Sequence, residues 1–440
     1  MIRRVLPSAA SAPPASLLFL ALLAAAGPAA AQRDKAPAND PASCPYCEND
    51  PELMGPAGVV SHGGFEFGNH DTAATDRYLA TADIRWIETE HFEIGMALAG
   101  YRPPQKEKKA IRAELTEMAE VLPTINPKTR LLDPWLRAHM FAWRAEKAWD
   151  RMLEILQVTE DQFPDGTVLW DMTGPYMGEG PYLGQKGKYE ILMLPSEALH
   201  YDYLVHEFGL PMKKTQRWNV VDRDTLTVVM HEGTGPKASG GSVFAQDDMT
   251  TASLKRDPAM HGHVVFNLAH NFLDGYKHYS YDTPIWIHEG LAHFMEREIS
   301  PEYNSFDSSE GGIAAETKKS KWHQEVLKIV KRGNAPRLAE LMALKNYAEL
   351  ELVHHFCTWS MIKYLIEEHP EGFAGLLADI CGIMDENGYA DGSNLPDKHR
   401  KAFKERLGMS YPEFDKAWRD WVLGIEPEPE DDVPLPLGGG

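Results

Sequence analysis

Histidine and glutamate residues gather in the second half of the chain, where their spacing could bind a metal ion. His270 ends one apolar stretch, and Glu289 and His293 lie about one helical turn apart in the next, WIHEGLAHF. Imidazole nitrogens and carboxylate oxygens are common ligands of Zn²⁺, and residues four apart on a helix share a face. These three residues are therefore candidate zinc ligands. His263, about two turns before His270, is a further candidate.

A neighbouring histidine does not extend this pattern. His288 directly precedes Glu289, so that the letters look like an HExxH zinc motif, but His288 and His293 are five residues apart. Five residues correspond to about 140° around a helix, and two such imidazoles cannot share one ion without distortion. We expect His288 at the edge of a cleft or at the surface.

The stretch Trp286–Phe294 resembles the pattern W-x-x-E-G-x-A-x-[FY] of the gluzincin zinc peptidases, in which the Glu is a zinc ligand. In these enzymes an HExxH helix supplies two zinc histidines and a general-base Glu. In their aminopeptidase branch eighteen residues separate that motif from the third ligand, and eighteen residues also lie between His270 and Glu289. The resemblance then places Phe266 at the first zinc histidine and Asn267 at the general base.

The resemblance implies a zincin-like fold in the peptidase MA-like (gluzincin) superfamily, with a degenerate metal site, over about residues 86–425. The stretch GGSVFAQDDM is similar to the edge strand that precedes the metal helix. Residues 354–377 and 407–423 are similar to the C-terminal helices, the first of which often begins with a Tyr. His355 holds that Tyr position.

Three interpretations of His270 and Glu289 stay open: a buried pair that ties two helices together, a metal site without activity, and a hydrolase. Asn267 cannot accept a proton at neutral pH, which favours a pseudopeptidase that binds a peptide, a protein or another ligand in the former cleft without a cofactor. The alternative is a metal-dependent hydrolase whose rebuilt zinc site uses His270, Glu289 and His293 or His263.

The elements that must position these residues form an α+β pattern, with a small mixed sheet followed by a mainly helical C-terminal half. Alternating residues predict strands within 83–98, and helices are predicted over 105–122 and from Pro134, with Asp133 as its cap. A strand then leads into a helix that begins after Ser196. Further helices are predicted at 259–273, 284–299, 314–331, 347–368 and 411–423.

The chain of 440 residues divides by composition. Residues 1–31 have the three parts of a secretory signal peptide, which predicts export to the periplasm or the cell exterior. Residues 32–82 form a Gly- and Pro-rich lead-in, 83–425 the peptidase-like domain (83–250 strand-rich, 251–425 helical), and 426–440 a disordered acidic tail. The formal net charge of −21 disfavours nucleic acid as a partner, and no later stretch is apolar enough to span a membrane.

Four cysteines fall within the predicted mature chain. An even number of cysteines in an oxidising compartment favours disulfides, and Cys44–Cys47 with Cys357–Cys381 is one of three connectivities. A Cys-Pro-Tyr-Cys segment also occurs in thiol–disulfide redox sites, but here a linker rather than a strand precedes it.

Overall fold

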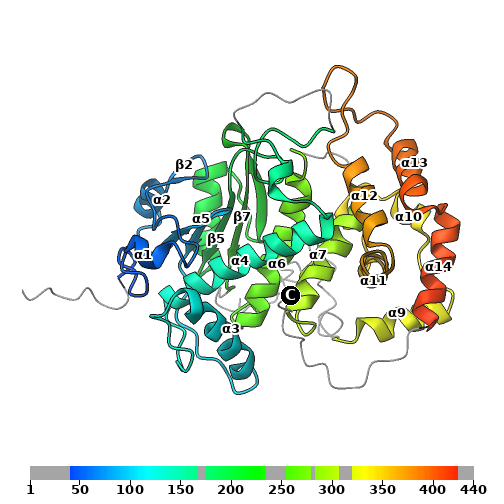
Figure 1. Cartoon of the computed structure of the whole chain (residues 1–440). Helices are drawn as coiled ribbons and strands as arrows, with labels where there is room; N and C mark the ends of the chain where they lie inside the picture. The colour runs from blue at the N-terminus through cyan, green and yellow to red at the C-terminus, as the bar shows by residue number, and fades with distance from the viewer. Residues whose placement is uncertain (1–39, 167–174, 234–253, 279–282, 307–319, 425–440) are drawn as a thin grey trace, which may run out of the picture. The chain divides into compact units, whose positions relative to one another are not determined.

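The computed structural model describes residues 40–166, 175–233, 254–278, 283–306 and 320–424 (Figure 1). The predicted signal peptide, the tail and the strand within GGSVFAQDDM lie outside these residues. The described residues of the lead-in belong to the same compact unit as the rest, Asn39–Gly440. Among the described helices, none is long and apolar enough to cross a membrane.

The central element is a five-stranded mixed sheet with the strand order β3-β4-β5-β7-β6. Figure 1 labels two of its strands, β5 and β7. The strand β4 pairs in parallel with β5, and β5 with β7, while β3 and β6 are antiparallel edges. A two-stranded sheet precedes it. The strands are β1 (Glu66–Phe67), β2 (His70–Asp71), β3 (Arg85–Glu88), β4 (Phe92–Met96), β5 (Tyr189–Leu194), β6 (Gln216–Val220) and β7 (Thr225–His231).

Both faces of the central sheet are buried, as the four consecutive apolar residues from Ile191 to Leu194 in β5 show. Ile191 and Met193 belong to the larger core, whereas Leu192 and Leu194 point to a second core on the opposite face. Such continuous apolar runs are typical of strands covered on both sides.

The helices around the sheet begin where local sequence signals place them. Asp133 caps α4 by accepting a hydrogen bond from the amide of Leu136, and Ser196 caps α5 in the same way. The helices of the first half are α1 (Pro51–Met54), α2 (Thr72–Tyr78), α3 (Lys108–Val121), α4 (Pro134–Leu156) and α5 (Glu197–Phe208), with 3₁₀ turns at Glu160–Gln162 and Val221–Arg223.

From residue 254 on, the described residues form mainly helices joined by turns and loops, so the predicted α+β class is confirmed. These helices are α6 (Asp257–Gly275), α7 (Ile285–Ile299), α9 (Trp322–Lys331), α10 (Leu338–Leu341), α11 (Leu352–Glu368), α12 (Pro370–Ile380), α13 (Leu395–Leu407) and α14 (Tyr411–Gly424), with a 3₁₀ turn at Tyr347–Glu349.

The helix α7 packs against both α6 and α11. Its approach to α11 depends on Gly290, because a Cβ atom there would lie 2.6 Å from Ile362 Cγ1 and 2.7 Å from the carbonyl oxygen of Thr358. Only glycine permits this close contact. The three helices therefore hold their facing side chains at short range.

A buried cluster of charges lies on the sheet. The guanidinium of Arg223 donates a hydrogen bond of 2.9 Å to Glu93 and a second one to Glu190. Burial, and then the nearby charge of Glu190, raise the pKa of Glu93 to about 7, although Arg223 opposes the shift.

The stability of the fold should therefore depend on the protonation of Glu93. Because the folded state raises this pKa above the ordinary value of 4.5, the bound proton stabilises the fold below about pH 4.5 and the effect is lost as the pH rises through about 7. We expect the free energy of unfolding of the wild type, relative to Glu93→Gln, to fall by about 1–3 kcal/mol across this range. Urea denaturation at several pH values measures it, and a difference that does not change with pH would contradict it.

Candidate functional site

The helices α6 and α7 bring together the residues that the gluzincin-like pattern singles out. His270 Nε2 lies 3.8 Å from Glu289 Oε1, and both side chains are at most 1% exposed. The ring of Phe266 fills the space beside them, with its centroid 5.0 Å from that of His270 and 5.2 Å from that of His293. The expected convergence of these side chains across two helices is thus present in the structure.

A third helix adds a histidine that the sequence did not indicate as a ligand. His355 Nδ1, on α11, lies 3.0 Å from His293 Nε2 and 3.3 Å from Glu289 Oε2. The distance between His293 Nε2 and Glu289 Oε2 is 3.4 Å. All three side chains are fully buried. The only sequence signal was the position of His355 near the start of a helix, where the resemblance expects a Tyr.

This set of donor atoms fits a transition-metal ion. The ligand atoms of Glu289, His293 and His355 all lie within 4.8 Å of one another. Zinc–nitrogen and zinc–oxygen bonds of about 2.0–2.2 Å in a tetrahedral site separate neighbouring donors by about 3.3–3.6 Å, close to the separations here. His270 faces the other oxygen of Glu289 and stands outside the three-donor group.

An acidic residue supports the imidazole of His293 from its other side. Glu296 Oε2 lies 3.5 Å from His293 Nδ1, and Glu296 also accepts hydrogen bonds from the amide and the hydroxyl of Ser305. Burial raises the pKa of Glu296 to about 8. A carboxyl group beside a histidine ligand is a common way of orienting the ring toward a metal.

Asn267, which the resemblance aligns with the general base, is an amide with fixed partners. Asn267 accepts a hydrogen bond of 3.0 Å from Arg217 of the edge strand β6 and donates one of 2.8 Å to the backbone oxygen of His263. The ring of His263 contacts Ser305 and Thr215 at 2.8 Å each. Both ring nitrogens of His263, the alternative ligand of the rebuilt site, thus have hydroxyl partners.

His288 is buried, whereas the sequence predicted a position at the edge of a cleft or at the surface. Its side chain is only 6% exposed, and its ring stacks on that of His270 at 5.6 Å with an interplanar angle of 9°. The cause is the packing of α7 between α6 and α11, which leaves little of this helix at the surface. His288 Nε2 lies 3.6 Å from Asp274 Oδ1.

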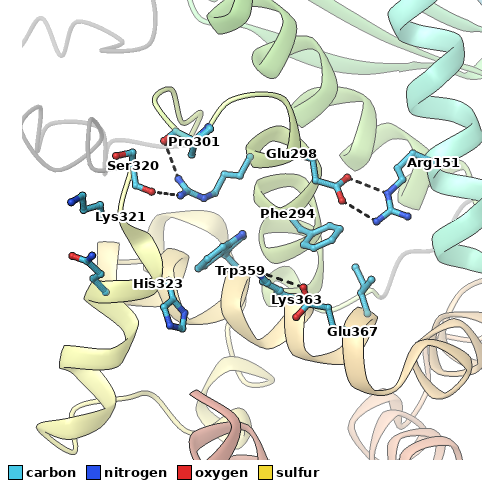
Figure 2. Close-up of a pocket in the computed structure, with 13 residues that line it drawn as sticks. Arg151, Phe294, Glu298, Pro301, Ser320, Lys321, His323, Trp359, Lys363 and Glu367 are labelled. Atoms are coloured by element: carbon cyan, nitrogen blue, oxygen red, sulfur yellow. Dashed lines mark hydrogen bonds and ion pairs between the residues drawn. The ribbon is translucent and has the colours of Figure 1, made fainter. Parts of the chain in front are cut away.

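A pocket of about 350 Å³ opens beside α7 (Figure 2). Arg151 and Glu298 form an ion pair in its wall, and Arg297 donates hydrogen bonds to the backbone oxygens of Pro301 and Ser320. The described residues that line it do not include Glu289, His293 or His355. This pocket is therefore separate from the donor group.

The predicted disulfides are wrong for this structure. Cys44, Cys47, Cys357 and Cys381 are all buried free thiols. Cys44 Sγ lies 3.0 Å from His139 Nε2, Cys47 Sγ lies 2.8 Å from His62 Nε2, and Cys381 Sγ lies 3.4 Å from Thr283 Oγ1. A disulfide would require two sulfur atoms at about 2.05 Å.

Comparison with known protein families finds no family model that matches the chain, and comparison with curated proteins finds no match. The gluzincin-like interpretation therefore depends on the residues of α6, α7 and α11 themselves.

Proposed function

We propose that the chain is a non-catalytic, exported relative of the gluzincin peptidases that keeps a metal centre at Glu289, His293 and His355. The observation that carries the proposal is the donor separation of 3.0–3.4 Å among these three buried side chains. Two imidazoles and one carboxylate form a ligand set that zinc peptidases use, which supports the superfamily and its zincin-like fold.

Hydrolysis is disfavoured by what surrounds the donors. A bound zinc ion would supply Lewis acidity and an activated water, and peptide hydrolysis also needs a base to take the proton of that water. Asn267 cannot accept a proton at neutral pH, and Glu289 cannot act as both ligand and base. The ligand-binding function that fits is the capture of a peptide or protein segment by the retained fold, without cleavage.

The metal content of the full chain tests this proposal. We expect wild-type protein loaded with Zn²⁺ and then desalted to keep about one equivalent more zinc than His293→Gln or His355→Gln, because each variant loses one of three ligands. His206→Gln is the control, since His206 is an exposed histidine on α5. Circular dichroism verifies that each variant is folded.

Peptide cleavage separates the two functions that the donor group permits. We expect no cleavage of a general peptide library by zinc-loaded protein. Cleavage that chelators abolish and His293→Gln eliminates would instead establish the alternative, a metal-dependent hydrolase with a rebuilt site. Equal zinc content in the wild type and both glutamine variants would overturn both functions.

A further inference from the structure

A second cluster of metal-ligating side chains lies away from α6 and α7, where the lead-in meets β3 and α4. We propose that Cys44, Cys47, His62 and His139 bind a structural zinc ion that fastens the lead-in to the domain. Their four ligand atoms all lie within 4.8 Å of one another. From the sequence, these two cysteines were expected to form a disulfide, with a redox pair as the alternative.

The two cysteines come from one tight turn. The amide of Glu48 donates to the carbonyl of Cys44 at 3.0 Å, and the amide of Asp50 donates to that of Cys47 at 2.7 Å. Glu48 and Asn49 follow with positive φ angles of 51° and 55°, which reverse the chain toward α1. The turn presents both thiols to the same side, as the Cys-x₂-Cys spacing of structural zinc sites does.

Two histidines from separate elements face these thiols. His139 of α4 places Nε2 3.0 Å from Cys44 Sγ and 4.0 Å from Cys47 Sγ. His62, next to a bridge between Ser61 and β3, places Nε2 2.8 Å from Cys47 Sγ. In a tetrahedral zinc site neighbouring sulfur and nitrogen ligands are about 3.3–3.8 Å apart, a range that the separations in this cluster bracket.

The orientation of His62 is set by the strand behind it. Its Nδ1–H donates to the backbone carbonyl of Trp86 at 3.0 Å, which leaves the lone pair of a neutral ring on Nε2, toward Cys47. Histidines that bind zinc commonly donate their other N–H in this manner. The cluster thus has both the ligand types and the outer hydrogen bond of a metal site.

The surroundings favour a closed structural site over a redox pair. Cys44 is 1% exposed, Cys47 is fully buried and His139 is 4% exposed, whereas a thiol pair that exchanges disulfides must be reached by its partner. Aromatic rings enclose the cluster, with Trp135 5.0 Å from His62 and Tyr46 6.0 Å from His139. Four protein ligands leave no open position for a substrate.

Cobalt substitution of the full chain tests the site without depending on the metal centre of α7. Protein freed of metal under reducing conditions and titrated with Co²⁺ should show intense thiolate-to-cobalt absorption, which a site of histidine and glutamate alone cannot produce. We expect Cys47→Ser to abolish the band. We expect His139→Gln to weaken Co²⁺ binding by more than roughly 10–100-fold, which is the loss typical when a residue that only supports a metal-binding side chain is replaced. The thiolate-to-cobalt band should persist in Cys357→Ser, which replaces a buried cysteine elsewhere in the chain, and in His293→Gln.

A measurement on wild-type protein avoids the risk that a variant fails to fold. After zinc loading, Cys44 and Cys47 should resist alkylation, and chelator treatment should expose both, as peptide mass spectrometry would show. The proposal is overturned if wild-type protein gives no thiolate–cobalt band, if chelation leaves the alkylation rates unchanged, or if the two cysteines are found as a disulfide in freshly purified protein.

Discussion

Replacing Phe266 by histidine and Asn267 by glutamate should raise the affinity of the chain for Zn²⁺ by at least about 100-fold, equivalent to about 2.7 kcal/mol. The ring of Phe266 lies 5.0–5.2 Å from the rings of His270 and His293, so an imidazole in its place reaches the donor group. The new glutamate would stand opposite Arg217, which now donates to Asn267. Competition with a chromophoric chelator measures the affinity.

Two single variants test whether the gain in zinc affinity requires the new imidazole. Phe266→Leu keeps an apolar side chain without a nitrogen ligand and should leave the affinity near that of the wild type, as should Asn267→Glu alone. The absence of any gain in the double variant would mean that the alignment of FNLAH with the metal-binding motif is misplaced.

Replacing Arg144 by methionine should lower the free energy of unfolding by about 3–5 kcal/mol, because it leaves a buried carboxylate without its partner. Arg144 donates to Asp257 at 2.7 Å and to Glu114 at 2.6 and 2.8 Å, which ties α4 to the start of α6 and to α3. Burial opposes the ionisation of Asp257, but the charge of Arg144 outweighs it and keeps the pKa of Asp257 below its ordinary value.

An exposed ion pair provides the control for this variant. Arg400 pairs with Asp397 at 3.0 Å, but the two side chains are 63% and 77% exposed. Solvent screens such a pair, so Arg400→Met should cost less than about 1 kcal/mol. Urea denaturation measures both variants, and equal losses of stability would show that the Arg144–Asp257 pair is not needed to hold α6.

Local signals in the sequence predicted much of the fold. The capping side chains of Asp133 and Ser196 act within a few residues of their own positions, so α4 and α5 begin where the sequence places them. The alternation within 83–98 indicated the strands β3 and β4. The order of the strands in the sheet depends on contacts between distant segments, and no local pattern encodes it.

The sequence likewise predicted only part of the candidate metal centre. His270 and Glu289 were found because their separation along the chain matches the gluzincin pattern, which describes two successive helices. His355 lies 62 residues beyond His293, and only the packing of α11 on α7 at Gly290 brings the two rings together. A spacing rule that covers α6 and α7 cannot include it.

The cysteines show how a reasonable inference from context can be wrong. A signal-like N-terminus and an even number of cysteines favoured disulfides. One of the two histidines that face the thiols, His62, lies 15 residues beyond Cys47 in the same lead-in, and the other is distant in sequence. His139 is 95 residues from Cys44, on a helix whose apolar residues are typical of a core. A local turn brings the two thiols together, but only tertiary folding brings His139 to them.

Anomalous diffraction at the zinc absorption edge, from crystals of zinc-loaded full-length protein, tests the metal centre of α7 and α11 most directly. We expect an anomalous peak bonded to Glu289, His293 and His355, with Asn267 still held by Arg217 and His263. A map of well-ordered helices without a peak among these three residues would contradict the proposed centre, whatever metal is found elsewhere in the chain.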